Sequence, residues 1–203
     1  MFYKKVVLFL VFVTLAGCAG SVRYKVSKDF SAARLDTVAV LAVAGEVPDA
    51  KIKEIFRNAA SKKLGAMNYD VLPSAAVDNI YAKYPDAAQG ADRVKEVSGL
   101  LNADSLLYIN VTGWKERFFV TYAALKINAE FTLYSKTGAV LWRGRYSTKE
   151  SEMRFDRELL KMDVIKAYEP RIERLVDTVL STLPRRPVEK KEEEKPKSYF
   201  DWL

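Results

Sequence analysis

Residues 125–134 constrain the fold most strongly, because apolar and polar side chains alternate there without interruption. The apolar members of the alternation are Leu125, Ile127, Ala129, Phe131 and Leu133. A period of two sends successive side chains to opposite faces of a strand, so this stretch predicts a strand with one buried face. Turn-forming residues at 135–138, followed by alternation over 140–146, predict a hairpin partner. Together with a strand-like run at 104–112, these segments predict an antiparallel meander.

The first half of the chain predicts a different kind of pairing. The run 37–43 is continuously apolar, as is typical of a strand buried on both faces. Helical periodicity over 49–64 and a short strand at 69–73 follow, which predicts a parallel βαβ unit with a right-handed connection. The remaining predicted elements are helices at 74–81, 92–101 and 165–180. The order βαβααβββα predicts an α/β (α+β) fold, in which helices pack on one mixed β-sheet.

The N-terminus has the three-part layout of a secretory signal. Lys4 and Lys5 form a positive region, residues 6–13 are all apolar, and small residues lead into Cys18. The apolar run is too short to span a bilayer as a helix. The sequence Leu15-Ala16-Gly17-Cys18 matches the bacterial lipobox, which predicts cleavage before Cys18 and lipidation (diacylglyceryl and palmitate chains) of that residue. Ala19 follows, and its resemblance to the sorting rule of Gram-negative lipoproteins implies the outer membrane.

The numbers of cysteine and histidine residues exclude several classes of catalytic and metal site. Cys18 is the only cysteine in the chain, so it has no internal disulfide partner, and lipidation removes a free thiol from an oxidising compartment. The chain has no histidine, which excludes Ser-His-Asp and Cys-His catalysis and any zinc or iron site built from histidine. P-loop, GxGxxG and GxSxG motifs are also absent from the sequence. We therefore predict no catalytic residues, no cofactor and no metal, and the export signal disfavours nucleic acid as a partner.

Composition divides the chain into four parts. We predict a signal peptide over 1–17, the lipidated cysteine with a polar tether over 18–34, and a single α/β domain over 35–183. Residues 184–203 are rich in Lys, Glu and Pro and predict a disordered charged tail. The tail ends in an aromatic tip that contains Tyr199, Phe200, Trp202 and Leu203. Such a tip is either a peptide motif that docks in a groove of a partner or a segment that folds back on its own domain.

A second candidate for partner binding lies inside the domain, where aromatic and charged residues are interleaved. Its aromatic members are Trp114, Phe118, Phe119 and Tyr122. These side chains either line a groove for a partner or touch lipid headgroups, or else they cap the core at a hairpin corner. Both interpretations remain open from the sequence.

Four segments resemble a known family. They are Val38–Leu41, Tyr69–Pro73, Asn102–Ile109 and Gly138–Gly144. Over roughly residues 35–182 the chain is similar to a family of small bacterial outer-membrane lipoproteins of unknown function. Members of this family are similar in fold to the N-terminal domain of TolB, to the curli-secretion lipoprotein CsgG and to the penicillin-binding-protein activator LpoB. The resemblance implies an envelope module that works with a protein partner, such as a CsgG-like lipoprotein, and it brings no catalytic residues.

These observations favour a lipid-anchored, non-catalytic binding or assembly module on the periplasmic face of the outer membrane. A first alternative is a subunit of a CsgG-like export or pore complex, which would form homo-oligomeric rings. A second is a carboxylate-dependent cell-wall hydrolase, which would require an acidic cleft.

Overall fold

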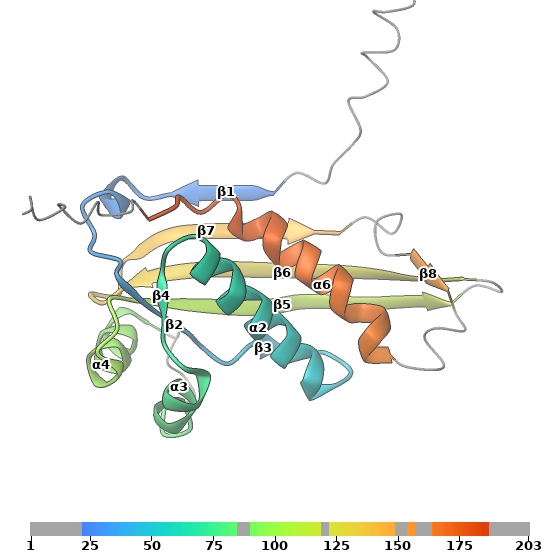
Figure 1. Ribbon diagram of the computed structural model, residues 1–203, viewed down its shortest axis with the longest axis horizontal. Coiled ribbons are helices and arrows are strands. Elements are labelled where there is room, and N and C mark those ends of the chain that lie inside the picture. The colour runs from blue at the N-terminus through green and yellow to red at the C-terminus, as the bar shows by residue number, and fades with distance from the viewer. Residues whose placement is uncertain (1–21, 85–89, 119–121, 149–153, 157–163, 187–203) are drawn as a thin grey trace, which may run out of the picture.

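The fold is a mixed β-sheet with helices on both faces, seen in a computed structural model that describes residues 22–84, 90–118, 122–148, 154–156 and 164–186 (Figure 1). The strand order is β1-β7-β6-β5-β2-β4, with β3 paired to β5 and β8 paired to β6. The strands are β1 (Arg23–Val26), β2 (Thr37–Val40), β3 (Ala44–Gly45), β4 (Asp70–Val71), β5 (Ser105–Phe118), β6 (Tyr122–Ser135), β7 (Val140–Ser147) and β8 (Arg154–Asp156). The helices are a 3-10 turn η1 (Lys28–Phe30), α2 (Ala50–Ala66), α3 (Ser74–Tyr81), α4 (Ala91–Leu101) and α6 (Val164–Leu180).

Both predicted pairing patterns are confirmed. β2 is parallel to β4 and to β5, whereas β5, β6 and β7 form an antiparallel meander. The register is irregular between Val111 and Gly113 on β5 and between Leu133 and Tyr134 on β6. All nine predicted elements are present, and the predicted mixed α/β fold is therefore confirmed.

α2 and α6 lie side by side over one face of the sheet and enclose the larger part of the core (Figure 1). The Asp49 carboxylate caps α2 by accepting a hydrogen bond of 2.8 Å from the backbone N–H of Lys51. The apolar stripe of α2 then buries Ile52, Phe56 and Leu64 completely. Large side chains from the sheet and α6 complete this core; they are Phe131, Trp142 and Tyr168.

α3 and α4 cover part of the opposite face, where β2 and the beginning of β5 lie. The smaller core there contains Leu41, Val77, Val97 and Leu106, all fully buried. Farther along β5, β6 and β7 the same face carries polar and charged side chains. None of the described helices belongs to a core cluster over that part of the face.

The structure differs from the predicted tether over residues 23–30. Residues 23–26 form β1, which pairs antiparallel with β7, and η1 follows directly. All four residues of β1 are exposed, so the strand has no buried face. Four residues are also too few for their alternation of basic and apolar side chains to separate a strand from a linker.

The predicted boundary at 183 also differs from the structure. Pro184 and Arg186 contact the domain through the Tyr69 hydroxyl and the Asp36 carboxylate, so the packed chain extends to residue 186. Residues 187–203 lie outside the described residues. Among the described helices, none has the length and apolar content needed to cross a bilayer.

Candidate functional site

Trp114, the first of the predicted partner-binding aromatics, packs against the domain's own helix α6. Its ring meets that of Tyr168 edge to face, with the centroids 5.3 Å apart and the planes at 79°. The indole Nε1 donates a hydrogen bond of 2.8 Å to Oε1 of Glu116. Burial, together with the hydrogen bond and negative charge of Glu116, raises the pKa of Tyr168. Trp114 is thus half-buried at the edge of the larger core.

The other predicted site residues have different positions. Phe118 ends β5 and Tyr122 begins β6, so both belong to the same long hairpin, and Tyr122 is half-buried. Phe119, Cys18 and the four residues of the aromatic tip lie outside the described residues. A role of these residues in binding therefore stays a prediction.

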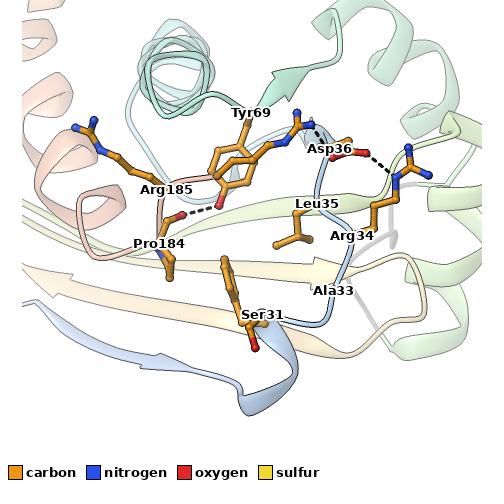
Figure 2. Close-up of a pocket in the computed structure, with 10 residues that line it drawn as sticks. Ser31, Ala33, Arg34, Leu35, Asp36, Tyr69, Pro184 and Arg185 are labelled. Carbon is orange, nitrogen blue, oxygen red and sulfur yellow. Dashed lines mark hydrogen bonds and ion pairs between the residues drawn. The ribbon is translucent and has the colours of Figure 1, made fainter. Parts of the chain in front are cut away.

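A pocket of about 390 Å³ forms where the two ends of the domain meet (Figure 2). Its walls come from residues 30, 31 and 33–36, from Tyr69 and from residues 184–186. The Tyr69 hydroxyl donates a hydrogen bond of 2.6 Å to the main-chain carbonyl of Pro184. This bond joins the segment before β4 to the chain that follows α6.

An ion-pair cluster forms one wall of the pocket. The Asp36 carboxylate lies 2.5 Å from Nε of Arg34 and 2.8 Å from Nη2 of Arg186 (Figure 2). The hydrogen bond from Arg34 and the charges of both arginines hold the pKa of Asp36 below its usual value, although desolvation acts in the opposite direction. Burial raises the pKa of Tyr69 to about 12, against a smaller lowering by the charge of Arg186.

This chemistry suits a structural junction better than a hydrolytic site. A carboxylic general acid needs a raised pKa, whereas the pKa of Asp36 is lowered. Tyr69 is held in its neutral form by burial and is engaged with a carbonyl. Within the described residues, no three His, Cys, Asp or Glu side chains gather closely enough to hold a metal ion.

The part of the sheet that the described helices leave uncovered carries three pairs of like charges. On β1 and β7, Arg23 lies directly opposite Arg145. Two residues along the same strands, Lys25 lies opposite Arg143. On β5 and β6, Lys115 lies opposite Lys126. Because side chains on a strand alternate between faces, and because the pairings run across neighbouring strands, all six cations lie on one face. We call these six residues the cationic face.

A carboxylate on β6 pairs with two of these cations. Glu130 on β6 lies opposite Arg145, at 2.5 Å from its Nε, and 3.3 Å from Nε of Arg143. The side chains of Arg143 and Arg145 are still 40% and 60% exposed. Arg23, Lys25, Lys115 and Lys126 are exposed as well. Glu130 therefore balances only part of the positive charge.

The cationic face was not predicted, although the sequence contains a signal for it. Basic residues recur at every second position in Arg23-Tyr24-Lys25 and in Arg143-Gly144-Arg145. This spacing puts both charges of each segment on one face of a strand. Which charges lie opposite one another depends on the strand register, which the sequence pattern alone did not supply.

The chain is similar to a known protein family and to several solved structures. Residues 26–182 match the model of a family described as "Putative lipoprotein GNA1162-like". The PelC dodecamer from Paraburkholderia phytofirmans is similar in structure, with a TM-score of 0.54 and 24% sequence identity over 83% of this chain and 100% of that one. Lipoprotein GNA1162 from Neisseria meningitidis has a TM-score of 0.49 and 20% identity over 68% of this chain and 98% of that one. For the C-terminal domain of LpoB from Salmonella enterica the values are 0.39 and 17%, over 58% and 84% of the two chains. No curated protein matches the chain.

Proposed function

Because the chain belongs to the GNA1162-like lipoprotein family, we propose that it is a lipid-anchored, non-catalytic assembly module of the cell envelope. In this proposal, Cys18 carries the lipid and holds the domain on the periplasmic face of the outer membrane. The domain then binds another envelope protein through an exposed edge of its sheet. The position and exposure of β1 are the observation that carries this proposal.

β1 ends the strand order of the sheet, so one side of its backbone is left without a partner among the described strands. Its apolar side chains are also exposed, with Tyr24 at 57% and Val26 at 36%. An exposed sheet edge is a template for pairing with a strand from another chain. The predicted lipid anchor at Cys18 lies five residues before Arg23, so this edge is held close to the membrane.

A ring or pore subunit is the second candidate, supported by the fold that the chain shares with PelC, whose structure is that of a dodecamer. In that case the strand that pairs with β1 belongs to a second copy of the same chain. The two candidates differ in the identity of the neighbour at β1, which a site-specific crosslink can report.

Lipid attachment is tested first, by mass spectrometry of the mature N-terminus in a Gram-negative host. We expect a diacylglyceryl-modified Cys18 and no modification in a Cys18→Ser variant. Membrane fractionation of both proteins then tests whether the lipid holds the chain in the membrane fraction. An unmodified Cys18 in the wild-type protein would contradict the proposal.

Assembly is tested with the full chain carrying the photo-crosslinking residue p-benzoylphenylalanine in place of Tyr24. A matched control carries it in place of Leu100 on α4, which is similarly exposed at 52%. We expect one major adduct from position 24 that position 100 does not give. An adduct with a different envelope protein supports the adaptor, and an adduct with a second copy supports the ring subunit. Equal, diffuse labelling from both positions would rule out β1 as the docking edge.

A further inference from the structure

The cationic face is arranged in a way that folding alone does not favour. Opposite charges directly across two strands stabilise a sheet, whereas like charges in that position destabilise it. Here the three pairs Arg23/Arg145, Lys25/Arg143 and Lys115/Lys126 each place two cations directly opposite each other. Self-repulsion of this kind is relieved when an anionic ligand lies over the charges.

The dimensions of the cationic face favour a broad ligand. β1, β7, β6 and β5 are consecutive neighbours in the sheet (Figure 1). Strands lie about 4.8 Å apart, so the charges spread over about 15 Å across the sheet. The Lys115/Lys126 pair lies four residues along β6 from Glu130, which is about 13 Å in the strand direction. A single small anion cannot span from the Lys115/Lys126 pair to the two pairs on β1 and β7, whereas an extended anionic surface contacts all three.

We propose that the cationic face binds the phosphate groups of the membrane to which the chain is anchored. This inference rests on the lipid anchor of the proposed function and adds the orientation of the domain. Arg23 lies five positions after Cys18, and an extended chain of that length reaches at most about 18 Å. The first cation of β1 therefore stays within a short distance of the headgroups.

The direction of β1 supports the same ligand. β1 runs antiparallel to β7, and its first residue, Arg23, pairs nearer the end of β7 than Lys25 does. The anchored segment therefore joins the sheet on the side toward the β5–β6 hairpin, where Lys115 and Lys126 lie. With the cationic face on the lipid, α2 and α6 face away from the membrane, and the edge of β1 remains accessible from the side.

The test removes four of the six cations and leaves Arg143 and Arg145 with their partner Glu130. The variant is R23Q/K25Q/K115Q/K126Q. The control, K51Q/K83Q/K95Q/K136Q, removes the same charge from exposed positions on α2, near α3, on α4 and in the β6–β7 turn. Both are made in the mature chain, residues 18–203, with Cys18→Ser, so that no lipid contributes to binding.

Binding is measured by co-sedimentation with vesicles of phosphatidylglycerol and phosphatidylethanolamine, and with phosphatidylcholine vesicles as the neutral reference. We expect the unsubstituted chain and the control to bind the anionic vesicles, with affinity falling as salt rises. The variant should bind at least about tenfold more weakly, because each cation near an anionic surface contributes about fivefold. Its thermal unfolding temperature should stay equal or rise, which separates lost binding from lost folding.

Three results would overturn the inference. One is equal binding to neutral and anionic vesicles, and another is equal weakening in the variant and the control. The third is a variant that keeps vesicle binding but loses binding to poly-glutamate, which would assign the cationic face to an acidic protein. Because these chains carry no lipid, each of these failures leaves the modification of Cys18 untouched, and that is measured separately.

Discussion

Removing the hydrogen bond between Tyr69 and Pro184 should destabilise the protein at neutral pH and stabilise it at alkaline pH. The substitution Tyr69→Phe keeps the buried ring and removes only the hydroxyl that donates to the Pro184 carbonyl. A net hydrogen bond contributes about 0.5–1.5 kcal/mol to the free energy of unfolding. We therefore expect the variant to be about 1 kcal/mol less stable than the wild type at pH 7.

At alkaline pH the comparison reverses. Burial raises the pKa of Tyr69 from 10.0 to about 12 in the folded protein. The unfolded chain then loses this proton before the folded protein does, so the stability contributed by Tyr69 is complete below pH 10 and is lost as the pH rises through about 12. The difference between the two pKa values corresponds to about 2.7 kcal/mol, which exceeds the hydrogen-bond contribution. The two stability curves should therefore cross at about pH 11, and the variant should be the more stable protein above it.

Urea unfolding followed by tryptophan fluorescence measures both quantities between pH 7 and 12. The other tyrosines with raised pKa values, Tyr108 and Tyr168, are present in both proteins and cancel in the difference. Curves that stay parallel up to pH 12 would refute the assigned pKa. Identical stability at pH 7 would refute the contribution of the hydrogen bond.

Three further predictions test other parts of the structure. Gly45→Ala should lower the free energy of unfolding in urea by about 2–3 kcal/mol, because φ is +96° and a Cβ would overlap the Val111 carbonyl oxygen. As its control, Gly99→Ala on α4, where a Cβ meets open space, should raise the same quantity by about 0.5–1 kcal/mol. Asp36→Asn should lower the free energy of unfolding at neutral pH, because it removes the charge that pairs with Arg34 and Arg186. The difference from the wild type should disappear as the pH falls below 3.8 and then through the lowered pKa of Asp36. A difference that persists at pH 2 would contradict the ion pairs. Trp114→Ala should cost about 2–3 kcal/mol in thermal unfolding through lost packing on α6, and a cost below about 0.5 kcal/mol would mean that the ring faces solvent.

The predictable part of the fold is the part whose side chains separate into buried and exposed sets. β6 has five buried apolar residues at alternate positions, and the sequence showed them directly. α2 and α6 were recognisable because their buried residues recur every three or four positions. In these segments the local pattern and the tertiary environment agree, so the pattern is sufficient.

The elements that were not predicted from the sequence bury few of their own side chains. β1 is exposed at all four positions and forms because β7 offers it hydrogen bonds. β3 and β8 contain only two and three residues, too few for any periodicity to appear. Their positions are consequences of the sheet that other segments build.

The candidate sites follow the same division. The lipobox and the Trp114–Tyr122 segment are continuous in sequence and could be singled out from it. The pocket cannot, because it joins residues 30, 31 and 33–36 with residues 184–186. The pairs Arg23/Arg145 and Lys25/Arg143 join residues that are 122 and 118 positions apart, so they depend on how β1 and β7 are aligned.

The pairing of the first strand with β7 also determines the order in which the chain can complete its structure. β1 is made early, but its partner follows more than one hundred residues later, and the contact between Asp36 and Arg186 needs residues that come later still. A chain synthesised from its N-terminus therefore keeps an unpaired strand until nearly the whole domain has been made. During that interval, the exposed backbone of β1 and the apolar stripe of α2 are open to non-native association. We therefore expect correct folding to require that the early half of the chain stays apart from other chains until α6 has been made.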